Sequence, residues 1–75
     1  MTTHASETLD ELLRDCIEGG DLTAFCVRAG ISPYTLHRLR RGQGKRSHRG
    51  TALAIAAERG VSEDRVQRAI ESSRA

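Results

Sequence analysis

The sequence predicts a small all-α protein built from five short helices. The chain has 75 residues, 37% of them hydrophobic and only 3% aromatic, so a single domain must form a limited core from aliphatic side chains and alanine. Alanine and arginine are plentiful and β-branched runs are absent, which favours helix over strand. Apolar residues recur at helical spacing in segments that end at glycines. We expect one domain over residues 8–72, between a flexible N-terminus (1–7) and a frayed C-terminus (73–75).

The first two expected helices precede a turn at Gly30. Thr8 and Glu11 have the spacing of a capping box at the start of the first helix, and two glycines at 19–20 end it. Asp21 is expected to cap the second helix. The residues expected to face the core from these two helices are Leu9, Leu12, Leu13, Cys16, Ile17, Leu22, Phe25, Cys26 and Ala29.

The other three helices are bounded by similar signals. Ser32 has the position of a cap, and Pro33 occupies the first position of a third helix that closes near residue 41. A fourth helix is expected over about residues 49–59, and Ser62 caps a fifth. The residues expected in the core from these helices are Leu36, Leu39, Ala52, Leu53, Ile55, Ala56, Val66, Ala69 and Ile70.

The formal net charge of +2 hides an uneven distribution. Residues 1–21 sum to −5, residues 22–57 contain seven bases and no acid, and residues 58–75 sum to zero. Six of those bases fall within residues 38–49. A segment with one sign of charge attracts polyanions such as nucleic acid, the alternative being an ordinary solvated face.

Several classes of protein are disfavoured by what the sequence lacks. No apolar run approaches the roughly 20 residues of a membrane span, and the N-terminal residues do not follow the pattern of a secretory signal. Cys16 and Cys26 lie at apolar positions, as expected for buried, reduced thiols of a cytoplasmic protein. Neither paired carboxylates nor an activated nucleophile indicates an enzyme, and His4, His37 and His48 lack the short spacing of metal ligands. We therefore expect no catalysis, metal or cofactor.

Residues 22–42 have the pattern of a helix-turn-helix. Two helices that cross steeply over a short turn need a residue that tolerates positive φ, here Gly30, followed by an apolar plug, here Ile31. Cys26 supplies a small side chain at the crossing, and Leu36 and Leu39 anchor the second helix. Its other faces are then free to enter a DNA major groove.

These features resemble those of a known family. Gly30-Ile31-Ser32, "TLHRLRRG" at 35–42 and "AAERGVS" at 56–62 make residues 8–70 similar to the five-helix, lambda repressor-like DNA-binding domains of phage repressors and Cro proteins. The resemblance implies a sequence-specific double-stranded DNA-binding transcriptional regulator, most often a small repressor of phage, plasmid or bacterial origin. It also implies a homodimer on a pseudo-palindromic operator, with residues 32–41 in the major groove.

The resemblance also assigns roles to individual residues. The family's base-reading positions fall on Pro33, Tyr34, His37 and Arg38, of which Arg38 can donate two hydrogen bonds to guanine. Its phosphate-contacting positions fall on Ser32, Thr35, Arg41, Lys45, Arg46 and Arg49. Two positions depart from the family: Leu22 stands where relatives often have glutamine, and Pro33 stands where they commonly have glutamine or arginine. Pro33 suits only an apolar contact such as a thymine methyl. Arg40, where relatives often carry Glu, is expected to pair with the acidic first helix.

A second Gly-(Ile/Val)-Ser unit is also a candidate for the turn before the DNA-recognition helix. Gly60-Val61-Ser62 has the same spacing as the first unit, but Glu63 and Asp64 follow it directly. Two carboxylates at that end of a helix are repelled by phosphate, so charge favours the unit at Gly30.

Two alternative functions stay open at this point. Proteins of this family also serve as antitoxins, which bind a toxin or another protein partner while they regulate their own operon; the acidic first helix or the fifth helix would supply such a surface. Recognition of single-stranded RNA is disfavoured, because the chain has no pair of aromatic side chains on which bases would stack.

Overall fold

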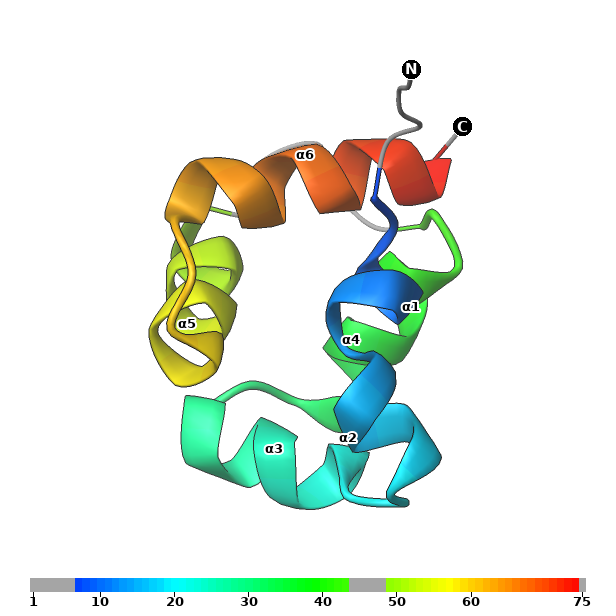
Figure 1. The fold of residues 1–75 in the computed structure, drawn as a ribbon, viewed down its shortest axis with the longest axis vertical. Helices are drawn as coiled ribbons and strands as arrows, with labels where there is room; N and C mark the ends of the chain where they lie inside the picture. The colour runs from blue at the N-terminus through cyan, green and yellow to red at the C-terminus, as the bar shows by residue number, and fades with distance from the viewer. Residues whose placement is uncertain (1–6, 44–48, 75) are drawn as a thin grey trace.

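The computed structural model describes residues 7–43 and 49–74, which form six α-helices and no β-strand. The predicted all-α fold class is confirmed. The six helices surround one hydrophobic core, with α6 across one end of the molecule and α3 at the other (Figure 1). In chain order they are α1 (Leu9–Leu12), α2 (Arg14–Glu18), α3 (Leu22–Ala29), α4 (Pro33–Arg40), α5 (Arg49–Arg59) and α6 (Glu63–Arg74).

The prediction of five helices is wrong, because the expected first helix is divided at Leu13. Leu13 has φ −106° and ψ 17°, outside the helical region, and its side chain is fully buried. Helix α1 packs against α4 and α6, whereas α2 packs against α3. The bend at Leu13 therefore lets one short apolar stripe cover both ends of the core. The predicted capping box is confirmed, since Thr8 and Glu11 exchange side-chain-to-backbone hydrogen bonds of 2.8 and 3.3 Å.

Most of the predicted core residues are buried; Ile17, Leu22 and Ala29 are only half-buried against the core, and one predicted residue is exposed. Leu53 was expected inside but is 48% exposed. Successive helical residues are about 100° apart, so Leu53 lies about 200° from Ile55, which is fully buried, and points away from the core. The buried hydrophobic residues are Leu9, Leu12, Leu13, Cys16, Phe25, Cys26, Leu36, Leu39, Ala52, Ile55, Ala56, Val66, Ala69 and Ile70.

The turn between α3 and α4 has the geometry that its sequence predicts. Gly30 adopts φ 73°, and the Ile31 amide donates to the Cys26 carbonyl over 3.0 Å. Ser32 Oγ accepts a hydrogen bond from the Tyr34 amide at 3.1 Å, which caps α4. The predicted side-chain cap at the start of α3 is wrong: Asp21 is the N-cap residue, but its carboxylate caps no amide and lies 4.0 Å from Arg28 Nη2, two turns further along the chain.

The turn between α5 and α6 repeats these devices. Gly60 adopts φ 70°, and the Val61 amide donates to the Ala56 carbonyl over 3.0 Å. Ser62 Oγ accepts from the Arg65 amide at 3.2 Å, as expected of the cap of α6. The chain thus contains two similar units, α3–turn–α4 (the α3–α4 unit) and α5–turn–α6 (the α5–α6 unit).

The last helix extends into the segment that was expected to fray. Helix α6 continues to Arg74, beyond the expected fraying point at residue 73. Its Ser73 hydroxyl donates to the Ala69 carbonyl and accepts from the Leu9 amide, at 2.9 and 3.0 Å. A Cβ on Gly42 would lie 2.6 Å from the Ser73 carbonyl oxygen, so the end of α4 packs closely on the same turn. These contacts explain why the last turn of α6 is retained.

Candidate nucleic-acid interface

Helix α4 has one side in the core and the other in solvent. Leu36 and Leu39 are 0% and 1% exposed, so they fix the rotation of the helix about its axis. Its N-terminus is fixed by the Ser32 cap and by Pro33 at the first helical position. Four predicted base-reading residues and one predicted phosphate contact are exposed together on this helix and its C-cap: Pro33, Tyr34, His37, Arg38 and Arg41.

Two arginines on this face lie next to rings from the preceding turn. The guanidinium carbon of Arg38 lies 5.6 Å from the centroid of the Tyr34 ring, within the range of a cation–π interaction. Arg41 Nη1 lies 3.5 Å from His37 Nε2. Each pair has the i,i+4 spacing that places two side chains on the same helical face. The face formed by Tyr34, His37, Arg38 and Arg41 is called the α4 face below.

Arg40 lies on a different side of α4 and is neutralised. Its Nε atom donates to Asp10 Oδ1 at 2.7 Å, which joins α4 to α1. The expected pairing of Arg40 with the acidic first helix is therefore confirmed. The same contact removes Arg40 from the cations that are available to an external anion.

Most other arginines in the described part of the chain are also paired with carboxylates. Arg14, Arg38 and Arg41 have no carboxylate within ion-pair distance among residues 7–43 and 49–74. Arg14 is the one base in the acidic segment 1–21, whereas the α4 face belongs to a segment without acids. The paired arginines are Arg28 with Glu58 (2.6 Å), Arg40 with Asp10 (2.7 Å), Arg59 with Asp15 (3.6 Å), Arg65 with Glu7 (2.9 Å) and Arg68 with Asp64 (3.1 Å).

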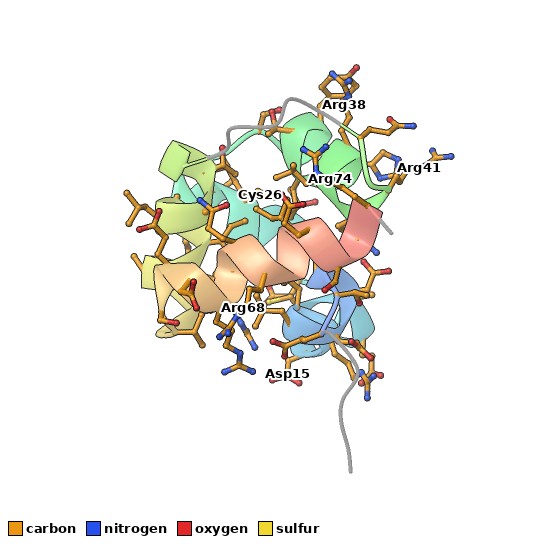
Figure 2. All side chains as sticks on the ribbon, turned by 90° about the horizontal axis from the view of Figure 1, so that it is seen from above. Asp15, Cys26, Arg38, Arg41, Arg68 and Arg74 are labelled. Atoms are coloured by element: carbon orange, nitrogen blue, oxygen red, sulfur yellow. The ribbon has the colours of Figure 1, made fainter. Side chains whose placement is uncertain are left out.

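These ion pairs shift the pKa values of the groups that form them. The hydrogen bond from Arg65 holds the pKa of Glu7 below its usual value, and the Glu58 carboxylate raises the pKa of Arg28. Figure 2 shows Arg38 and Arg41 on one side of the molecule, with Asp15 and Arg68 on the opposite side. The unpaired cations are thus separated from the acidic surface of α2. The positive electrostatic potential of the α4 face is therefore not neutralised by nearby carboxylates.

A groove of about 350 Å³ runs between α3 and α4, beside the α4 face. Its floor includes Cys26 and Leu36, which are almost completely buried. Pro33, Tyr34 and His37 also line it. The remaining lining residues are Leu22, Thr23 and Arg40. The groove places apolar surface next to the start of α4, where the sequence predicts an apolar contact by Pro33.

Apart from Arg41 on the α4 face, the predicted phosphate contacts fall into three groups. Ser32 is exposed, and its oxygen accepts the Tyr34 amide, so its hydroxyl proton is available to an acceptor outside. Thr35 is half-buried. Lys45 and Arg46 lie outside the described residues; Arg49 is the first residue of α5, and its side chain also lies outside the description.

The start of α6 is acidic, whereas the first turn of α4 carries no charged side chain. Glu63 and Asp64 lie in its first turn, and Asp64 accepts an ion pair from Arg68 on the following turn. Arg65 is held by a bidentate pair with Glu7, at 2.9 Å for each of its two hydrogen bonds. A helix with acids in its first turn and paired arginines behind them is poorly suited to phosphate.

A second groove, of about 570 Å³, is lined by Leu12 and by six charged residues: Glu7, Glu11, Arg14, Asp15, Arg59 and Arg65. Arg59 also donates to Cys16 Sγ over 3.6 Å. Both cysteines are free and buried, as expected, and burial, with a smaller contribution from Cys16, raises the pKa of the Cys26 thiol. Among the described residues no three His, Cys, Asp or Glu side chains gather as metal ligands.

Comparisons with protein-family models, with curated proteins and with solved structures found no match to this chain. None of the helices in residues 7–43 and 49–74 has the length and apolar character needed to cross a membrane.

Sequence reasoning missed the ring–arginine pairs of the α4 face and the groove beside it. The i,i+4 spacing of Tyr34 with Arg38 and of His37 with Arg41 was available in the sequence as a signal. The groove was not available, because it depends on how α3 and α4 cross.

Proposed function

We propose that this protein is a sequence-specific double-stranded DNA-binding transcriptional regulator, and that α4 enters the major groove. The observation that carries the proposal is the α4 face: Arg38 and Arg41 are exposed, lie on one helix with Tyr34 and His37, and have no carboxylate partner in the described part of the chain. Elsewhere in that part, five arginines are paired with acids. A cation that is left unpaired on a small protein favours an external polyanion.

The arrangement of α3 and α4 supports the same proposal. An α3 that buries Phe25 and Cys26 in the core, a turn at a left-handed glycine and an α4 anchored by two leucines match the requirements of a helix-turn-helix, in which the second helix reads base edges. We propose that the fold is the lambda repressor-like arrangement that the sequence resembles, and with it a small repressor. The likeness further supports a homodimer on a pseudo-palindromic operator, with half-sites about one helical turn, ~34 Å, apart.

Arg38 is the residue to which we assign direct base recognition. A bidentate contact with guanine contributes about 1–3 kcal/mol of discrimination between bases. Arg38→Ala should therefore lower the preference for the selected site, while Lys45→Ala and Arg46→Ala should weaken binding to all sequences alike. Selection of duplexes from a random pool, followed by anisotropy titrations on the selected and scrambled sites, makes the measurement. Equal, sequence-independent losses of affinity in all three variants would show that Arg38 does not recognise a base.

Pro33 is assigned an apolar contact. Its ring lies at the start of α4 and lines the groove with Leu22, so a thymine methyl is the base feature that suits it. Replacing each thymine of the selected site by deoxyuridine removes the methyl groups and leaves the hydrogen-bonding edges intact. At one thymine position, the replacement is expected to weaken binding by the wild type and to leave binding by Pro33→Ala unchanged. Equal losses in the two proteins would show that Pro33 makes no such contact.

A second candidate function is that of an antitoxin or another protein-binding module that also regulates its operon. The observation in its favour is the charged groove that Glu11, Arg14 and Asp15 help to line. Asp15 lies on the side of the molecule away from Arg38 (Figure 2). A partner seated there would leave the α4 face accessible to DNA. Co-expression with the product of the adjacent gene, followed by size-exclusion chromatography, tests this candidate: Asp15→Lys should abolish a complex that Arg41→Gln leaves intact.

A further inference from the structure

We propose that Tyr34 is a positioning residue for Arg38, and that the Tyr34–Arg38 stack makes guanine the base that α4 prefers. This inference rests on the proposed function, because it assigns a role at the same DNA-reading face. Tyr34 is 68% exposed, so burial in the core does not explain its presence. Its ring is instead the neighbour of the Arg38 guanidinium, at 5.6 Å from centroid to carbon.

The stack is fixed by the beginning of α4. Tyr34 is the second helical residue, and its amide donates to Ser32 Oγ at 3.1 Å. The cap and Pro33 hold this first turn in helical geometry, so the ring projects from a rigid position. Arg38 follows four residues later on the same face. A flexible arginine side chain thereby loses part of its conformational freedom before it meets DNA, which lowers the entropic cost of binding.

A ring holds a guanidinium without neutralising it. Arg28, Arg40 and Arg65 are held by carboxylates at 2.6–2.9 Å, and those carboxylates occupy the same N–H groups that would bind a base or a phosphate. An aromatic face instead attracts a guanidinium through its π-electrons and accepts no classical hydrogen bond from its N–H groups. The in-plane N–H groups of Arg38 stay free, and two of them match the N7 and O6 acceptors of guanine.

The neighbouring pair on the α4 face also places an arginine beside an aromatic ring. Arg41 Nη1 lies 3.5 Å from His37 Nε2, at the outer limit of a hydrogen bond. An imidazole likewise leaves the positive charge of the guanidinium in place. The positive charge of Arg41 therefore stays available, which fits a phosphate contact that demands charge more than orientation.

The test is a double-mutant cycle on base discrimination. Two duplexes are compared: the selected site with guanine at the position read by Arg38, and the same site with 7-deazaguanine there, which lacks the N7 acceptor. Discrimination is the dissociation constant of the second duplex divided by that of the first. Tyr34→Leu should reduce this ratio by about two- to five-fold, the equivalent of an exposed cation–π contact. Tyr34→Phe keeps the ring and should match the wild type. In an Arg38→Ala background, Tyr34→Leu should change the ratio no further.

Two results would overturn the inference. One is an unchanged ratio in Tyr34→Leu; the other is an equal effect of Tyr34→Leu with and without Arg38. A readout on the free protein separates positioning from folding: ring-current shifts of the Arg38 δ-protons should be present in the wild type and Tyr34→Phe and absent in Tyr34→Leu. Failure of the proposed function looks different, since the wild type itself would then show no salt-dependent binding to any duplex.

Discussion

The α3–α4 unit and the α5–α6 unit have the same backbone devices and different surfaces. Each has a left-handed glycine, with φ of 73° and 70°, and each following residue donates its amide to a carbonyl of the preceding helix over 3.0 Å. Each second helix starts at a serine cap. The α4 face, however, carries arginines next to rings, whereas Arg65 and Arg68 of α6 are paired with acids. Backbone geometry therefore does not distinguish the two units, and the pairing of their charges does.

The largest expected effects are on stability, and they should be similar in both units. Leu39 of α4 and Ile70 of α6 are 1% and 2% exposed, so both second helices are anchored in the same core. Leu39→Ala and Ile70→Ala should each lower the free energy of unfolding by about 2–5 kcal/mol, as buried aliphatic truncations do. Urea denaturation followed by circular dichroism makes the measurement. A large loss for one and almost none for the other would show that the units are not structurally equivalent.

The serine caps sharpen the comparison, because they separate stability from binding. Ser32→Ala and Ser62→Ala each remove one side-chain bond to a helix amide, of 3.1 and 3.2 Å, and should cost about 0.5–2 kcal/mol of stability. Only Ser32 is assigned a phosphate contact, so only Ser32→Ala should also weaken DNA binding. Thermal melts and anisotropy titrations on the same two variants compare the effects. Equal losses of DNA affinity would argue against a role specific to Ser32.

The smallest expected effect is a pH dependence of stability that arises from the Glu7–Arg65 ion pair. Because Arg65 lowers the pKa of Glu7, the pair stabilises the folded state above the ordinary carboxyl value near 4.5. That stabilisation should be lost as the pH falls through the lowered folded-state pKa. Glu7→Gln should therefore be slightly less stable than the wild type at pH 7 and equally stable near pH 2. Melting temperatures across this range test the prediction, and a difference that persists at the acidic end would contradict it.

Local signals were sufficient to predict most of the fold. The caps at Thr8, Ser32 and Ser62 and the glycine at 30 each depend on residues within a few positions, and all four have the expected geometry. Two of the expectations that failed depend on distant contacts. The bend at Leu13 reflects packing of α1 and α2 against different helices, and the ordered end of α6 reflects its bond to the Leu9 amide.

The candidate site was predictable only in part, for the same reason. Charge patterning along the chain indicated α4 and not α6, and the pairing of Arg40 with the acidic first helix followed from it. Arg28 was not distinguishable from the other bases of its acid-free segment, because its partner Glu58 lies 30 residues away on α5. The unpaired state of Arg38 and Arg41 is a property of the folded chain.

The most direct test of the central claim compares two charge-matched double variants. Arg38→Gln/Arg41→Gln and Arg65→Gln/Arg68→Gln each remove two positive charges, from the α4 face and from α6. Affinity for a random-sequence duplex is measured by anisotropy between roughly 50 and 200 mM salt. The first variant should bind more weakly, with a plot of log affinity against log salt that is shallower by about 1 to 2 units, while the second should match the wild type. Equal changes in the two variants, or a change confined to the second, would contradict the assignment of α4 as the DNA-binding helix.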